Sequence, residues 1–349
     1  MKLIDTKEVP LPGMKKRHFT IPVFIPEEAC PNRCVFCNQH HIAGTERAPS
    51  VSEVIDKVNE FLATIPPDSE TEIGFFGGNF TGIPRQEQIA YLASVQTYIE
   101  KGQVSGIRIS TRPDYIDQES LQILRKFHVR AIELGAQSLD EQVLILAGRG
   151  HTARQVHEAS AMIKDAGFSL GLQIMIGLPG DTREKSLFTA NEIIRLGADN
   201  TRIYPTLVIK DTELEQLFHA GKYKPLSLEE AVDQVAELVP LFIQSGVKIL
   251  RIGLHPSEGL IDHTSLVAGP FHVAFGEMVF TEIWRRVFKD MFFENGKRNI
   301  LTLTLAPGMR NAAIGHKAMN KAILMQNFRK VVFTENAGLK GFEYHAHTL

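Results

Sequence analysis

An apolar run leads directly into three closely spaced cysteines in FTIPVFIPEEACPNRCVFC, residues 19–37. The apolar part has the length and composition of a buried β-strand. Cys30, Cys34 and Cys37 are the only cysteines among 349 residues, so they cannot build a disulfide framework, and their crowding indicates a shared ligand. We therefore expect a metal or cluster loop at the carboxyl end of a first strand, where parallel α/β folds build their sites.

Downstream of this loop, apolar runs alternate with amphipathic stretches, a pattern typical of βα units on a parallel sheet. Strands are predicted at residues 19–25, 72–76, 106–110, 131–136, 170–176 and 201–207. Helices are predicted at residues 54–65, 86–101, 118–127, 153–166, 184–196 and 229–244. Because each strand is followed by a helix, we expect the α/β class and a partial (β/α)6 TIM-like barrel.

The pattern changes after residue 245. The remaining elements are predicted as strands at 248–252, 300–305 and 331–334 and an aromatic-rich helix at about 273–292. We therefore expect an N-terminal extension over residues 1–18, the partial barrel over 19–245, and a small C-terminal α+β module over 246–349 that packs on the barrel.

The composition, 44% hydrophobic and 22% charged, is that of a chain able to bury a large core. No apolar run reaches the roughly 20 residues that span a bilayer, and the amino terminus lacks the apolar stretch of a signal peptide. We therefore expect a cytoplasmic protein with no membrane partner. The net charge of -2 is uneven, because residues 281–349 contain 11 Lys and Arg against 5 Asp and Glu. This basic segment fits a solvated surface and a polyanion-binding surface equally.

Three thiolates without a fourth suggest a particular kind of metal site. A four-iron cluster needs one ligand per iron, so three cysteines leave one iron open for another molecule. A zinc site is the alternative, with His40 or His41 as the fourth ligand, because the spacing from Cys37 allows it. The cysteines alone leave both kinds of site open.

The loop Cys30-x3-Cys34-x-Phe36-Cys37 resembles the cluster loop of the radical S-adenosylmethionine (SAM) superfamily, which has an aromatic residue just before the last cysteine. The resemblance implies that the three cysteines are the catalytic metal ligands of a 4Fe-4S cluster whose open iron chelates SAM. It also implies reduction by an external one-electron donor and cleavage of SAM to a 5'-deoxyadenosyl radical, which takes hydrogen from a substrate.

Other motifs at the strand ends extend the resemblance to the cofactor pocket. The residues expected to bind the cofactor are Phe36, Gly77, Gly78, Asn79, Ser110, Thr111, Arg112, Glu133, Gln137, Ile176, Gly177 and Leu178. Paired glycines let the main chain approach a ligand, and hydroxyl and guanidinium groups suit ribose and carboxylate recognition. For Glu133, inside a predicted strand, a ligand contact and a structural hydrogen-bond network are both open. Tyr204 and His151 are candidates for facing the substrate.

Four motifs, at residues 135–138, 149–152, 177–180 and 203–209, together resemble the radical domain of the catalytic third subunit of Elongator. The cysteine spacing is more compact than in that subunit, and we expect no acetyltransferase domain. Because that subunit modifies wobble uridine in tRNA, the resemblance implies RNA, either tRNA or rRNA, as a substrate. Basic residues compatible with RNA are Arg285, Arg286, Lys317, Lys321, Arg329 and Lys330, whereas Trp284 is expected in the module's core.

Two alternatives to an RNA-modifying enzyme stay open. One is a radical enzyme that acts on a small metabolite. The other is a non-catalytic RNA-binding protein in which the cysteine loop binds zinc and the barrel serves as a scaffold.

Overall fold

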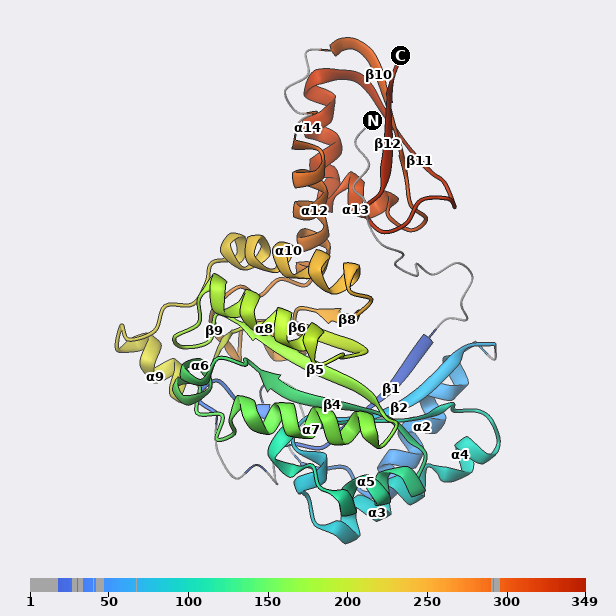
Figure 1. Ribbon diagram of the computed structural model, residues 1–349, viewed down its shortest axis with the longest axis vertical. Coiled ribbons are helices and arrows are strands. Elements are labelled where there is room, and N and C mark those ends of the chain that lie inside the picture. Colours follow the sequence, from blue (N-terminus) through green and yellow to red (C-terminus); the bar gives the residue numbers. More distant parts are fainter. Residues whose placement is uncertain are drawn as a thin grey trace.

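The computed structural model describes residues 18–26, 30, 34–39, 41, 47–66, 68–289, 291 and 296–349. The predicted extension over residues 1–18 therefore lies outside the described residues except for His18, and so does His40. In the described part, a curved sheet carries helices along its outer side, and a smaller unit of helices and strands stands off one end (Figure 1).

Seven parallel strands form the large sheet in the order β1-β2-β3-β4-β5-β6-β8. They are β1 (His18–Phe24), β2 (Glu70–Phe76), β3 (Gly106–Thr111), β4 (Val129–Gln137), β5 (Ser169–Ile176), β6 (Asn200–Pro205) and β8 (Lys248–Ile252). Strands adjacent in sequence are adjacent in the sheet, so the predicted α/β partial barrel is confirmed. It has one strand more than expected, because β8, which we assigned to the appended module, pairs with β6. The domain boundary at residue 245 stays a prediction.

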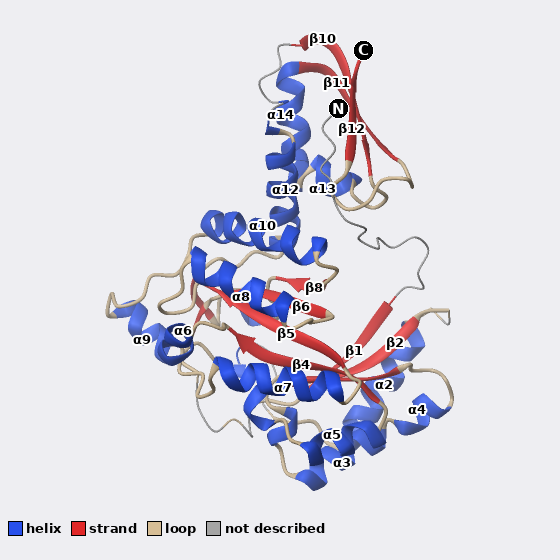
Figure 2. Cartoon of the chain, in the orientation of Figure 1, coloured by secondary structure: helices blue, strands red, loops and turns tan. Residues whose placement is uncertain are grey.

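The helices lie outside the strands, as Figure 2 shows. They are α2 (Val51–Thr64), α3 (Arg85–Ser94), α4 (Gln96–Glu100), α5 (Gln118–Lys126), α6 (Glu141–Leu146), α7 (Ala153–Asp165), α8 (Arg183–Arg195), α9 (Glu213–His219) and α10 (Leu228–Gln244). Capping boxes at Ser50, Thr152 and Ser227 fix the starts of α2, α7 and α10. The single helix predicted over residues 86–101 is divided at Val95 into α3 and α4. None of the described helices combines the length and apolarity of a membrane span.

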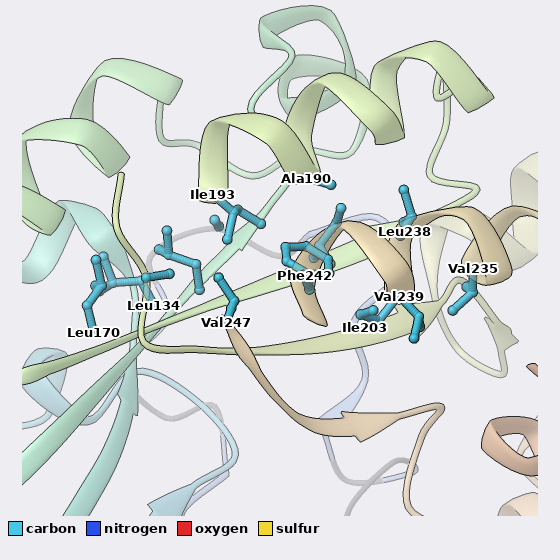
Figure 3. Packing of buried hydrophobic residues seen from close by; sticks show 14 of the residues in the cluster. Leu134, Leu170, Ala190, Ile193, Ile203, Val235, Leu238, Val239, Phe242 and Val247 are labelled. Atoms are coloured by element: carbon cyan, nitrogen blue, oxygen red, sulfur yellow. The ribbon is translucent and has the colours of Figure 1, made fainter. Parts of the chain in front are cut away.

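Apolar side chains fill the space between the sheet and the outer helices. Phe242 of α10 is fully buried and belongs to the same cluster as Ile193 of α8 and Ile203 of β6 (Figure 3). Along β6, Ile203 faces this core, whereas Arg202 and Tyr204 face the inside of the barrel. The strand alternation therefore separates an apolar outer layer from a polar interior.

The C-terminal unit has a three-stranded sheet in the order β11-β10-β12. Its elements are α12 (Phe275–Val287), β10 (Gly296–Leu305), α13 (Arg310–Ile314), α14 (Met319–Asn327), β11 (Phe328–Glu335) and β12 (Tyr344–Thr348). Two short segments, β7 (Val208–Ile209) and β9 (Leu266–Ala268), pair antiparallel, and α11 (Glu258–Ile261) precedes β9. Trp284 is fully buried against Phe288 and Tyr344, as the sequence predicted.

An ionic network joins this unit to the barrel. Arg286 of α12 donates to Asp233 of α10 at 2.5 Å and to Glu282 at 2.9 Å. Asp233 also accepts from Arg183 of α8. One carboxylate on α10 therefore links helices from both units.

Replacing Phe242 with alanine tests the packing of α10. We expect Phe242→Ala to lower the free energy of unfolding by about 3 to 5 kcal/mol, because a large buried ring leaves a cavity. Phe188→Ala is the matched control, since Phe188 on α8 is 49% exposed, and its change should stay within about 0.5 kcal/mol. Urea denaturation followed by circular dichroism measures both. Equal losses in the two variants would contradict the packing described for Phe242.

Candidate active site

A cavity of about 720 Å³ occupies the inside of the half-barrel. Predicted site residues on its wall are Cys30, Cys34, Phe36, Cys37, Gly77, Gly78, Ser110, Thr111, Arg112 and Gln137. They come from distant parts of the sequence, but the carboxyl ends of parallel strands meet at one edge of a sheet. The structure thus brings the cysteines and most of the expected cofactor pocket to one place.

Five predicted residues lie elsewhere than on this wall: Asn79, Glu133, Ile176, Gly177 and Leu178. Asn79 Oδ1 accepts from Thr111 Oγ1 at 2.7 Å and from the main-chain N–H of Arg112 at 3.3 Å, so Asn79 orders the end of β3. The N–H of Gly177 donates to Asp181 at 2.8 Å and shapes the turn after β5. Their roles as cofactor contacts stay predictions.

The cysteine loop is fixed to the barrel by main-chain and side-chain hydrogen bonds. The N–H of Val35 donates to the carbonyl of Ala147 at 3.1 Å, and the carbonyl of Val35 accepts from Leu214 at 2.7 Å. Arg149 Nη1 donates to Cys34 Sγ at 3.0 Å. A guanidinium donor beside a sulfur favours negative charge there, which suits a thiolate ligand.

His41, the alternative zinc ligand, has other partners. Its Nδ1 lies 3.1 Å from Ser265 Oγ and its Nε2 lies 3.0 Å from Asp211 Oδ2. Across the part of the chain that the structure describes, no group of three or more His, Cys, Asp or Glu side chains could hold a single metal ion. In a four-iron cluster each thiolate binds a different iron, so its ligands do not converge on one point. The cysteine arrangement is therefore compatible with a cluster, and His41 fastens the loop to the β7–β9 segment.

Several buried polar atoms on the cavity wall have no hydrogen-bond partner among the described residues. They are Ser110 Oγ, Arg112 Nη1, Gln137 Oε1 and Arg149 Nε. Leaving such an atom unsatisfied costs about 1 to 3 kcal/mol each. Gln137 also has a φ of 65°, a left-handed conformation that costs further energy in a residue other than glycine. These groups match the amino, carboxylate and hydroxyl groups of a ligand such as SAM.

Gly77 at the end of β2 is required by the geometry. Its φ is +112°, and a Cβ atom at this position would meet the carbonyl oxygen of Ile25 at 2.7 Å. Any other residue would push β1 and the cysteine loop away from β2. The residues present therefore fit a 4Fe-4S cluster and SAM.

Charged side chains inside the barrel form a buried network. Glu133 is 1% exposed and accepts from Arg108 Nη1 at 3.1 Å and from Arg202 Nε at 2.6 Å. Arg108 Nε also donates to Glu72 at 2.7 Å. Burial alone would raise the pKa of Glu72, but hydrogen bonds from His18 and Arg108, with their charges, lower it to about 2. Of the two roles open for Glu133, the structure shows the network.

Glu72 and Arg108 were not among the site residues expected from the sequence. The available signal was a charged residue at an alternate position within an apolar strand, because such a side chain must have a partner inside the barrel.

The two candidates for facing the substrate lie in different places. Tyr204 is on the cavity wall, and burial raises the pKa of its hydroxyl. His151 is 4% exposed and does not line this cavity. Burial and the charges of Arg149 and Arg112 lower the pKa of His151 to about 3, so its imidazole is neutral near pH 7.

The structure is a half-barrel with three cysteines beside a cavity at the carboxyl ends of its strands. This is the architecture of a cofactor-dependent enzyme built on a partial barrel. Residues 24–192 match the radical SAM superfamily, and residues 198–285 match the Radical_SAM C-terminal domain. The chain belongs to the radical SAM superfamily, whose reaction is the reductive cleavage of SAM at a 4Fe-4S cluster.

The resemblance to Elongator is confirmed by two relatives. Elongator complex protein 3 of Saccharomyces cerevisiae is 40% identical over 150 residues, which cover 42% of this chain and 27% of that protein. A tRNA uridine(34) acetyltransferase of Methanocaldococcus infernus is 34% identical over 134 residues, covering 37% of this chain and 24% of the relative. These matches thus span about a quarter of each relative's length.

A solved structure shares the fold. The chain superposes on the archaeal Methanocaldococcus infernus Elp3 with an N-terminal deletion at a TM-score of 0.61 and 21% identity. The match covers 78% of this chain and 64% of that one.

Replacing Glu133 tests the buried network. We expect Glu133→Gln to lower the free energy of unfolding by about 3 to 5 kcal/mol, because two guanidinium groups lose a buried carboxylate. Glu100→Gln, at an exposed position of α4, is the control and should change stability by less than about 0.5 kcal/mol. Thermal unfolding measures both. Unchanged stability of Glu133→Gln together with weaker SAM binding would instead make Glu133 a cofactor contact.

Proposed function

We propose that this chain binds a 4Fe-4S cluster through Cys30, Cys34 and Cys37 and uses SAM to modify RNA. The observation that carries the proposal is that the three cysteines line one cavity together with Ser110 and Gln137, each of which has a buried polar atom without a hydrogen-bond partner among the described residues. An external one-electron donor completes the reaction.

The chain's own residues supply binding, orientation and shielding. When bound, the cluster and SAM supply methionine and a 5'-deoxyadenosyl radical, which takes a hydrogen atom from the substrate. Phe36 would contact the adenine, and main-chain carbonyl groups at Gly77 and Gly78 would accept hydrogen bonds from the amino group of SAM. Ser110, Arg112 and Gln137 bind the remaining polar groups of SAM. Apolar wall residues, among them Phe76 and Met175, exclude water from the reacting atoms.

The relatives support RNA as the substrate class. Their names describe tRNA uridine chemistry and a protein of the Elongator complex, and this chain itself belongs to the radical SAM superfamily. Because only about a quarter of each relative is matched, the acyl transfer that one relative's name describes is not carried over. A tRNA substrate would place the enzyme in the cytoplasm. A small metabolite remains the second candidate, since the cavity itself is large enough for one.

The cluster assignment is tested by Cys34→Ala. Anaerobically reconstituted wild-type protein should be brown. It should release 5'-deoxyadenosine when it is reduced by an electron donor in the presence of SAM. The variant should lose the iron–sulfur absorbance and the product, because one iron loses its ligand. Ser245→Ala, at an exposed helix end, is a control that should keep both. Cleavage retained in Cys34→Ala, or colourless wild-type protein with about one zinc, would contradict the assignment.

The substrate class is tested by comparing modified nucleosides from tRNA and rRNA of cells with and without this protein. Mass spectrometry should find one modified nucleoside missing from the deleted strain. Wild-type protein should restore it and Cys34→Ala should not, because the modification depends on the radical. Identical nucleosides in both strains would favour the small-metabolite alternative.

A further inference from the structure

One side of the cavity is formed by β8, the strand that the sequence did not place in the barrel. Lys248 and Arg251 line the cavity from this strand. Arg251 Nε donates to the carbonyl of Gly253 at 2.9 Å, and its Nη2 donates to that of Leu254 at 3.1 Å. Within the described part of the chain, neither cation forms an ion pair with a carboxylate. Two positive charges therefore face the cavity uncompensated.

The strand register places a third cation beside them. Arg202 of β6 and Arg251 of β8 are paired positions, and both side chains line the cavity. Arg202 shares the carboxylate of Glu133 with Arg108, and burial together with the nearby charge of Arg202 lowers the pKa of Arg251. Like charges at adjacent positions of a sheet are destabilising. An anion bound between β6 and β8 would remove this repulsion.

The only carboxylate on the cavity wall among the described residues is already in use. Glu72 accepts from Arg108 at 2.7 Å and from Thr20 Oγ1 at 3.0 Å. The carboxylate of this wall is therefore not available to Lys248 and Arg251, and an anionic ligand group would give both cations a partner.

Aromatic side chains line the same cavity. Phe24, Phe76 and Tyr204 are on the same wall, and the rings of Phe24 and Phe76 lie 6.3 Å apart. The guanidinium of Arg202 lies 5.2 Å from the centroid of the Phe76 ring. Nucleobases stack on aromatic rings and on guanidinium planes. An inorganic anion would leave these surfaces unused.

We infer that the β6–β8 side of the cavity is a subsite for one nucleotide unit, in which Arg251 and Lys248 bind the phosphate and Phe76 with Arg202 contacts the base. This inference rests on the proposed function, because it names the substrate class that meets the radical. The phosphate can belong to a polynucleotide chain or to a free nucleotide, and both present the same oxygens to Arg251.

Binding of uridine 5'-monophosphate and uridine to the reconstituted protein, measured anaerobically by titration calorimetry, tests the inference. The monophosphate should bind more tightly than uridine. Arg251→Gln should weaken monophosphate binding by about 10- to 100-fold and leave uridine unchanged, because charged hydrogen bonds are lost. Lys248→Gln, at an exposed position where folding is not at risk, should act in the same direction. Lys101→Gln removes the same charge away from the cavity and should change neither affinity.

The outcomes separate this inference from the proposed function. Equal affinities for the monophosphate and uridine, or equal effects of Arg251→Gln on the binding of both, would overturn the subsite. Arg251 would then only stabilise the turn at Gly253. Absence of 5'-deoxyadenosine from the wild type would overturn the proposed function without affecting the binding result. Tighter binding of a uridine trinucleotide than of the monophosphate would assign the phosphate to RNA, and the reverse order would assign it to a free nucleotide.

Discussion

One buried network of ion pairs holds the inside of the half-barrel, and Glu133 lies at its centre. Its carboxylate joins Arg108 of β3 to Arg202 of β6, and Arg108 continues to Glu72 of β2. Removing these groups from water is costly, so each charge depends on its neighbour. The network therefore fixes how strands on opposite sides of β4 lie relative to one another. The cysteine loop and the cofactor pocket are built at the carboxyl ends of the same strands.

The sequence predicts the layers of this fold better than its interior. Apolar runs and helix caps locate the first six strands, because those patterns are local. The seventh strand, Lys248–Ile252, was not expected in the sheet because it follows a long helix and precedes a Gly/Pro-rich stretch, but it pairs with β6. The three cysteines and Gln137, which were singled out from sequence motifs, line one cavity because the carboxyl ends of parallel strands converge at one edge of the sheet. The partners of Glu133 and His41 come from distant strands and segments, and no local pattern reveals such pairings.

The cysteine loop is attached to the barrel on two sides, and this attachment bears on its chemistry. Val35 connects it to the segment after α6 and to the start of α9, while His41 connects it to Asp211 and Ser265. A cluster with one open iron must keep a fixed position relative to the groups that bind SAM. The elements that contact Val35 and His41 supply that fixed position. Arg149 contributes to both needs, since it contacts Cys34 and the carbonyl of Gly135.

The positive charge of the C-terminal unit is smaller in effect than its composition implies. Arg286 is ion-paired with Asp233 and Glu282, and Arg285 is paired with Glu282. Arg286 therefore fastens α12 to the barrel, and Arg285 forms an ion pair within α12. Neither guanidinium is left unpaired to bind a polyanion. Inside the barrel, in contrast to these two arginines, Arg251 has no carboxylate partner in the described chain. For the recognition of an anionic substrate, a basic residue that the fold leaves unpaired counts for more than one that is already ion-paired.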